Sequence, residues 1–118
     1  MKVLVTGAGG FLGRRIVESL LAQGVQHVRV HVRQAPPKGM VEGLRERYPQ
    51  ATIEVVQANL LSRGDALAPM VQGVDCVVHA AAGMKGAAAD MFANTVLTTR
   101  NLLEAACTQN IRRIVLIS

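Results

Sequence analysis

Three glycines with a spacing of three residues, Gly7, Gly10 and Gly13, lie near the start of the chain, within residues 6–13 (TGAGGFLG). Gly7 allows a tight turn out of a strand, Gly10 lets a phosphate approach the main chain where a Cβ would block it, and Gly13 lets the following helix pack closely on the sheet. The free amides and the dipole of that helix attract negative charge. The run therefore predicts a cradle for a diphosphate, which we expect to be formed by Gly7, Gly9, Gly10, Phe11, Leu12 and Gly13.

The elements around these glycines distinguish a ligand site from a merely flexible turn. Residues 2–6 (KVLVT) are an apolar run typical of a buried strand, and residues 11–23 predict a helix that ends before Gly24. A second extended run, residues 27–33, follows at about the spacing of roughly twenty residues that the dinucleotide-binding fingerprint requires. A phosphate loop of the Walker type is excluded, because no Gly-Lys-Ser/Thr follows. Burial of the helix is expected at the apolar positions with helical spacing, Leu12, Ile16, Leu20 and Leu21.

The end of the 27–33 strand is expected to select between NAD and NADP. An acidic residue there would bind the ribose hydroxyls, whereas an arginine would pair with the 2′-phosphate of NADP. The sequence has Arg33 and no carboxylate before Glu42, which favours NADP; NAD is the alternative if Arg33 is only a solvated charge. The alternation of apolar and basic residues in this strand also predicts that one of its faces lies near solvent.

The rest of the chain continues the alternation of strands and helices. We expect strands at residues 51–57, 75–79 and 113–118, and helices at 40–48, at 65–71 with Asp65 near the N-cap, and at 94–108. This order predicts one α/β domain, residues 1–118, with a Rossmann-type doubly wound parallel sheet of five strands and helices on both faces. The last helix is spaced for burial at Leu97, Asn101, Leu102, Ala105 and Ala106, and a ligand could lie close to the backbone at the small residues Ala80, Ala81 and Ala82.

The amino-acid composition limits which other binding partners and which cellular location we expect. The formal net charge of +5 would suit nucleic acid, but the basic residues are dispersed and only Phe11, Tyr48 and Phe92 could stack on bases, so a dinucleotide is the better anion. No run approaches the roughly 18 apolar residues of a membrane span, and no signal-type stretch precedes the glycines, so we expect a soluble, cytoplasmic protein. Cys76 and Cys107 lack metal-ligand spacing; we expect buried free thiols and no metal site.

Four motifs together resemble the extended short-chain dehydrogenase/reductase superfamily, which includes NAD-dependent epimerase/dehydratases and 3β-hydroxysteroid dehydrogenase-like proteins. They are VTGAGGFLG at 5–13, Asn59-Leu60, DCVVHAA at 75–81 and TRNLLEAA at 99–106. The resemblance implies that Asn59 and Leu60 lie beside the adenine, although the family usually has an aspartate at the first of these positions. It also implies a contact from the last helix, where Thr95 replaces the usual asparagine and Asn94 could supply the amide.

The catalytic groups of the family are not found in this chain. Members use a Tyr-x-x-x-Lys pair with a serine or threonine, and the single tyrosine here, Tyr48, is followed four residues later by Thr52. No catalytic residue is therefore assigned, and Tyr48 is expected to pack at a helix end. We interpret His79 as a strand-end histidine hydrogen-bonded to backbone, because one imidazole without a partner makes no catalytic unit.

The resemblance implies that the chain is the N-terminal part of a longer protein and that its sheet is incomplete. The leading hypothesis is the NAD(P)-binding portion of an oxidoreductase or epimerase that transfers hydride to or from a hydroxyl or keto carbon of a small-molecule substrate, with a homodimer as a further expectation. The chain alone should bind cofactor without turnover, and apolar surface left uncovered beside the fifth strand should favour association. The alternatives are a non-catalytic NADP-sensing module and, less favoured, a basic nucleic-acid-binding domain.

Overall fold

The computed structural model describes residues 1–62, 64–81 and 93–117, without the side chains of residues 64, 65, 93 and 94. No helix within these ranges is long and apolar enough to cross a membrane. The elements are β1 (Lys2–Thr6), α1 (Phe11–Ala22), β2 (His27–Val32), α2 (Met40–Arg47), β3 (Thr52–Gln57), a 3-10 turn (Gly64–Leu67), α3 (Ala68–Val71), β4 (Cys76–His79), a π-helical turn (Ala93–Leu97), α5 (Thr98–Ala106) and β5 (Arg113–Leu116).

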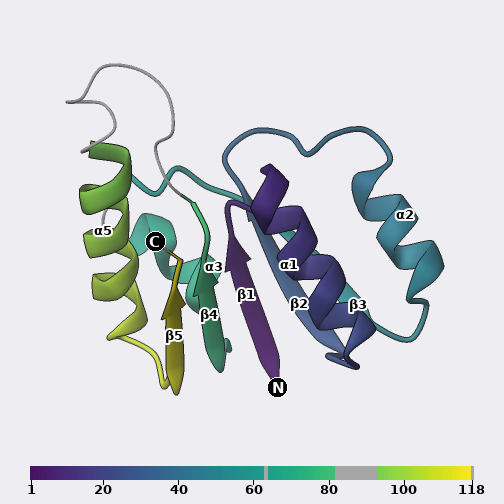
Figure 1. The fold of residues 1–118 in the computed structure, drawn as a ribbon. Helices are drawn as coiled ribbons and strands as arrows, with labels where there is room; N and C mark the ends of the chain where they lie inside the picture. The colour runs from purple at the N-terminus through teal and green to yellow at the C-terminus, as the bar shows by residue number, and fades with distance from the viewer. Residues whose placement is uncertain (63, 82–92, 118) are drawn as a thin grey trace.

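The five strands form one parallel sheet in the order β3-β2-β1-β4-β5. The chain runs outward from β1 through β2 to β3 and then crosses back, so that β4 pairs with the other side of β1 (Figure 1). The prediction of a Rossmann-type doubly wound parallel sheet of five strands is therefore confirmed. Because the direction of winding reverses between β1 and β4, the segments that leave these two strands diverge at a switch point.

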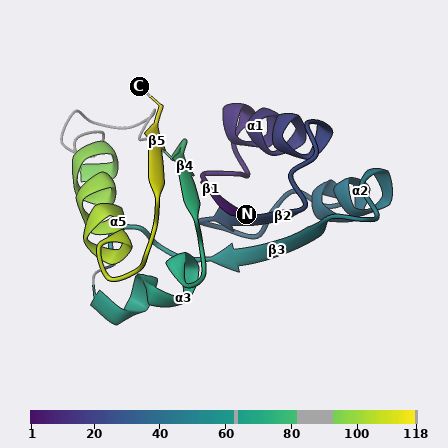
Figure 2. The same cartoon turned by 90° about the horizontal axis from the view of Figure 1, so that it is seen from below.

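Helices cover both faces of the sheet. Figure 2 shows α1 and α2 on one side and α3 and α5 on the other. Alternate residues of β1 enter two separate cores: Val3 and Val5 pack with α1 and α2, whereas Leu4 packs with α3 and α5. Burial on both faces explains why β1 is an almost continuous apolar run.

β2 is an internal strand, and the expectation that one of its faces lies near solvent is wrong. Arg29 and His31, the two central polar residues of the alternating pattern, are only 8% and 2% exposed; His27 at the start of the strand is half-buried, and Arg33 lies beyond its end. Arg29 donates from Nε to Glu54 Oε2 (2.8 Å) and from Nη1 to the carbonyl oxygens of Met70 and Gln72 (both 2.8 Å). The alternation reflects polar side chains that are buried because they have hydrogen-bond partners.

The buried stripe of α1 is displaced by one position from the predicted one. Leu12 is 46% exposed, and Ile16 and Leu20 are half-buried. The sheet instead faces a stripe with a spacing of four residues, formed by Gly13, Val17 and Leu21. A glycine can belong to this stripe because α1 begins in close contact with the turn before it.

The helices predicted at 65–71 and 94–108 are each divided into two segments. The first is the 3-10 turn Gly64–Leu67 followed by α3, whose N-cap is Leu67 rather than Asp65. Pro69 lies in the first turn of α3, where the missing N–H of a proline costs least. The second begins with the π-helical turn and continues as α5, which buries Thr98, Asn101, Leu102 and Ala106, while Leu97 and Ala105 are half-buried.

Apolar surface remains uncovered at the β5 edge of the described structure. Val115, Leu116 and Ile117 are 38–53% exposed, which confirms the sequence-based expectation. The two cysteines are free, as expected, but only partly buried: Cys76 is half-buried, and Cys107, just after the end of α5, is exposed. The expectation of two buried thiols is therefore wrong.

Candidate functional site

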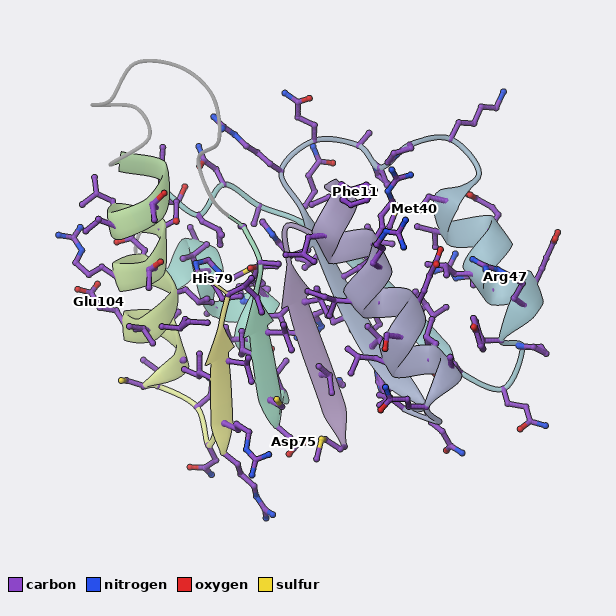
Figure 3. All side chains as sticks on the ribbon, viewed as in Figure 1. Phe11, Met40, Arg47, Asp75, His79 and Glu104 are labelled. Carbon is purple, nitrogen blue, oxygen red and sulfur yellow. The ribbon has the colours of Figure 1, made fainter. Side chains whose placement is uncertain are left out.

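The candidate site lies where β1 and β4 end at the switch point. Figure 3 shows Phe11 at this end of the molecule and Asp75, which precedes β4, at the opposite end of the sheet. Thr6 pairs with His79 at the ends of the two strands. In an open parallel sheet, ligands bind beyond the carboxyl ends of the strands at such a reversal, so the fold places the glycine turn in the expected position.

Two glycines of the turn are required by the backbone itself. Gly7 has a φ of +67°, and a Cβ there would lie 2.8 Å from the Cα and N of Ala81. A Cβ on Gly13 would lie 2.1 Å from the carbonyl oxygen of Gly7. The predicted tight turn at Gly7 is confirmed, whereas the close contact that requires glycine at position 13 is with the preceding turn and not with the sheet.

Gly10 is different, because the protein itself has room for a side chain there. Gly10 is exposed and has extended backbone angles, and a Cβ would meet only the Gly7 oxygen, at 3.4 Å. As the N-cap of α1 it supplies no capping side chain, and the first turn has no acidic residue. The first amides of α1 therefore have neither a capping side chain nor an acidic neighbour, and an anion could approach them.

Apolar and cationic side chains surround this helix start. Phe11 is 70% exposed and Leu12 46% exposed, so both can contact a ligand. The guanidinium of Arg15 lies over the Phe11 ring, with its Cζ 4.7 Å from the ring centroid. The entrance to α1 is thus electropositive and partly apolar, a combination suited to a dinucleotide.

Beneath the turn, a chain of hydrogen bonds fixes the state of His79. The amides of Ala80 and Ala81 donate to Thr6 Oγ1 (3.1 and 3.3 Å), so the Thr6 hydroxyl can donate to His79 Nδ1 (2.7 Å). On the other side, Thr99 Oγ1 donates to the carbonyl of Thr95 (2.6 Å) and accepts from His79 Nε2 (3.0 Å). The network requires a neutral imidazole that is protonated on Nε2.

This geometry supports a structural role for His79. Burial lowers its pKa, and the nearby His31 lowers it further. Both ring nitrogens have partners, so the ring links β1 to α5. The partners, however, are two threonine side chains and not the backbone groups that we expected.

The carboxyl end of β2 carries the residue expected to select the cofactor. Arg33 is exposed directly after β2, and Val32, beside it, packs near Gly9: a Cβ on Gly9 would meet Val32 Cγ1 at 3.6 Å. Arg33 therefore follows the neighbouring strand at the end where the glycine turn lies. This position is compatible with a contact to the ribose end of a dinucleotide.

The segment after β3 supplies the residues expected beside the adenine. Asn59 is exposed, and its Oδ1 accepts from the amide of Leu61 (3.0 Å), which leaves Nδ2 as its donor toward a base. Leu60 is 5% exposed and lies in the core, so only its main chain could contact a ligand. Its carbonyl accepts from Asn101 Nδ2 (2.9 Å), which ties the segment to α5.

The small residues after β4 are described only in part. Ala80 and Ala81 are half-buried against the glycine turn, in agreement with their expected place. Ala82 and the side chain of Asn94 lie outside the described residues. Their proposed contacts therefore stay predictions.

The family profile described as the NAD dependent epimerase/dehydratase family matches residues 3–118. The chain belongs to this family. Three relatives illustrate its similarity to other proteins. Over 123 residues it is 36% identical to ketoreductase adrE of Penicillium rubens, and over 121 residues it is 35% identical to cinnamoyl-CoA reductase 1 of Petunia hybrida. A short-chain dehydrogenase/reductase superfamily protein from Agrobacterium tumefaciens, solved with bound NAD, has a TM-score of 0.75 at 35% identity.

The matches include nearly all of this chain but a minority of each relative. They cover 99% and 98% of the chain against 36% and 34% of the ketoreductase and the cinnamoyl-CoA reductase. For the Agrobacterium structure the shares are 98% and 32%. The chain thus spans about a third of the length of the relatives it matches.

Within this family member, Tyr48 is part of the packing. It is half-buried against the core between the sheet and α1 and α2, and the Arg47 guanidinium lies 5.9 Å from its ring centroid. It follows α2 and precedes β3, so it lies near the amino ends of the strands, away from the glycine turn. The expected role at a helix end is confirmed.

Sequence reasoning missed three side chains that shape the site, namely Thr6, His31 and Thr99. Gly7 N donates to His31 Nδ1 (3.1 Å), and burial lowers the pKa of this imidazole. The sequence signal for His31 was its place in the alternating run of residues 27–33, but that alternation predicts a solvent-exposed face. Thr99 lies in the recognised helix motif, but only the three-dimensional structure brings its hydroxyl to His79.

Proposed function

We propose that residues 1–118 form an NAD(P)-binding domain and that they supply this domain to an oxidoreductase or epimerase. The observation that carries the proposal is the glycine turn at the switch point, where the chain itself requires Gly7 and Gly13, whereas a Cβ on Gly10 would meet only the Gly7 oxygen, at 3.4 Å. Steric necessity explains two glycines of the motif. A ligand at the main chain explains the third.

Different residues of the site would contact different parts of the cofactor. The first amides of α1 would hold the pyrophosphate, and Asn59 would contact the adenine. Arg33 would meet the ribose end, and its charge favours NADP over NAD. The NAD-bound Agrobacterium relative supports binding of a nicotinamide dinucleotide in this fold, while the preference for NADP rests on Arg33 alone.

A bound nicotinamide would supply the hydride, and the chain would bind and orient it. Phe11, Leu12 and the half-buried alanines 80 and 81 would form the apolar lining that limits water around the ligand. The 118 residues contain no Tyr-x-x-x-Lys pair, so we expect binding without turnover. Reduction or epimerisation of a small-molecule substrate would require further residues of the parent protein, and homodimer formation is a separate proposal for that protein.

The same absence is compatible with a second candidate, a module that senses NADP without catalysis. The two candidates share the binding site and differ in the rest of the protein. Full-length protein that binds NADPH but neither reduces carbonyl compounds nor epimerises sugar nucleotides would favour the sensor.

The binding proposal can be tested with a Gly10→Val variant, titrated with NADPH and NADH by calorimetry and thermal shift. The wild-type chain should be stabilised as free ligand increases. The variant should fold, because its backbone angles suit valine, yet bind roughly tenfold or more weakly, a loss of about 1.4 kcal/mol or more. Gly43→Val is the matched control, since a Cβ there meets nothing within 4 Å. A wild-type chain that responds to neither dinucleotide, or a Gly10→Val variant that binds as the control does, would refute the proposal.

A further inference from the structure

His31 is a buried side chain beneath the glycine turn, and both of its ring nitrogens have hydrogen-bond partners. It is 2% exposed at the end of β2, on the face of the sheet opposite to α1. Its Nδ1 accepts from the amide of Gly7 (3.1 Å), and its Nε2 lies 2.9 Å from the carbonyl oxygen of Ala58. One rigid ring thus contacts both the glycine turn and the segment that follows β3.

These two partners require a single chemical form of the ring. An amide can only donate, so Nδ1 must be an unprotonated acceptor; a carbonyl can only accept, so Nε2 must carry the proton. A ring protonated on both nitrogens would direct an N–H at the N–H of Gly7. The lowered pKa keeps the neutral form at neutral pH.

Main-chain hydrogen bonds also connect the glycine turn and the segment after β3 to β2, but each of these bonds involves only one of the two segments. Ala8 N donates to the carbonyl of His31 (2.8 Å), and Ala58 N donates to the carbonyl of Val32 (3.1 Å). Among the hydrogen bonds of the described residues, the imidazole is the one planar group that joins both segments. It also holds Gly7, the residue whose left-handed conformation defines the turn.

We infer that His31 is a positioning residue, which couples the glycine turn to residues 58–60 so that the proposed pyrophosphate and adenine contacts are held at a fixed separation. The inference rests on the proposed function for the identity of the ligand. The ring itself is too buried to contact a substrate, and both of its nitrogens are already used. Its effect must therefore reach the cofactor through Gly7 and Ala58.

The test compares His31→Leu, which removes both hydrogen bonds, with His31→Asn, whose side-chain oxygen can still accept from Gly7 but whose amide does not reach Ala58. Amide hydrogen exchange is measured in the ligand-free chain, and NADH and NADPH affinities are measured by calorimetry. In His31→Leu we expect Gly7 and residues 58–61 to exchange faster, and both dinucleotides to bind roughly tenfold more weakly, the effect of about one lost hydrogen bond. His31→Asn should restore protection at Gly7 only, with intermediate affinity.

The matched control is His27→Gln, which alters a histidine at the other end of the same strand. It should leave both affinities and the exchange of Gly7 unchanged. Unaltered Gly7 exchange in His31→Leu, or affinity within twofold of wild type, would overturn the inference. If the wild-type chain binds neither dinucleotide, the proposed function fails, and Gly7 exchange still decides whether His31 positions the turn. Should His31→Leu not fold, His31→Asn and the ring ¹⁵N shifts of the wild type decide: a ring without a proton on Nε2 would contradict the inference.

Discussion

Gly13 and the carbonyl of Gly7 are in such close contact that a Cβ on Gly13 would lie 2.1 Å from the Gly7 oxygen. The same oxygen accepts from the amide of Gly10 (3.1 Å). The start of α1 is therefore packed directly on the turn that precedes it. This contact fixes where the first amides of the helix point, and thus where an anion could bind.

Gly13→Ala should destabilise the chain, because neither the Gly7 backbone nor α1 can move without breaking the turn. Overpacking of this kind costs about 1–3 kcal/mol, measured as the free energy of unfolding in urea. Gly43→Ala, within α2, should be neutral or stabilising by up to about 1 kcal/mol, because its Cβ enters open space and alanine favours helix. Equal stability of the two variants would show that the contact between Gly7 and Gly13 is unimportant.

Arg33→Ala should weaken NADPH binding by roughly tenfold and leave NADH binding unchanged, because only NADPH carries the 2′-phosphate that the guanidinium would pair with. Isothermal titration of both dinucleotides measures the difference. Arg112→Ala is the charge-matched control: Arg112 is exposed and precedes β5, at the amino ends of the strands. Equal losses for the two dinucleotides in Arg33→Ala would exclude the assignment.

Glu54 gives the chain a specific sensitivity to acid. Burial alone would raise the pKa of its carboxyl, but hydrogen bonds from Arg29 and His27, with the charges of Arg29 and Lys2, outweigh that effect and lower the pKa to about 2. A carboxylate whose pKa is lower in the folded chain stabilises it above the unfolded pKa of 4.5, and this stabilisation is lost as the pH falls from there toward 2.

Glu54→Gln should therefore lower the free energy of unfolding at pH 7 by about 1–2 kcal/mol, a value reduced for solvent screening of a partly exposed group, and should flatten its dependence on pH below 4.5. Urea unfolding at pH 7 and pH 3.5 measures both effects. Glu18→Gln should change stability by less than about 1 kcal/mol, since the pair of Glu18 with Arg47 is about half exposed. A Glu54 variant that behaves like Glu18→Gln would contradict the assignment.

The two buried histidines should make the chain less stable in mildly acidic solution. Burial lowers the pKa of both His31 and His79 below the ordinary 6.5. The unfolded chain then binds more protons than the folded one, so the stabilisation present above pH 6.5 is lost as the pH falls through the folded pKa values. The slope is at most about 1.4 kcal/mol per pH unit for each ring.

His79→Gln keeps hydrogen-bonding groups at this position but does not titrate. Its free energy of unfolding should fall less steeply than that of the wild type between pH 7.5 and 5.5, and lie below the wild-type value at pH 7.5. Equal slopes in the two proteins would mean that His79 does not titrate differently on folding.

The features that could be predicted from the sequence are those that depend on residues close together in the chain. The strand before the glycines, the amphipathic helix after them and the stops at Gly24 and Pro49 depend on residues adjacent in sequence. So does the need for glycine at position 7, since a left-handed turn out of a strand is a local property. Arg33 and the alanines after β4 could be placed because parallel strands bring their carboxyl ends to one edge, whereas Asn59 was placed by the resemblance to the family.

Other features depend on contacts between residues far apart in sequence. The alternating pattern predicts that Arg29 and His31 face solvent, because alternation alone cannot distinguish a solvated face of a strand from a face that packs in a second core. Their partners Glu54, Met70, Gly7 and Ala58 lie between 24 and 41 residues away. Likewise, Thr6 and Thr99 come to His79 only through strand pairing and the packing of α5.

The sequence alone thus determined the order of the elements, the parallel sheet and the glycine turn. Secondary-structure propensity, the periodicity of apolar residues and the steric limits on backbone angles all act over a few neighbouring residues. Only the tertiary structure decided which polar side chains are buried, which tautomers the histidines adopt, and that a side chain would clash at Gly13 but not at Gly10. The physical reason is that a buried polar group is tolerated only with a hydrogen-bond partner, and the position of that partner is set by the fold as a whole.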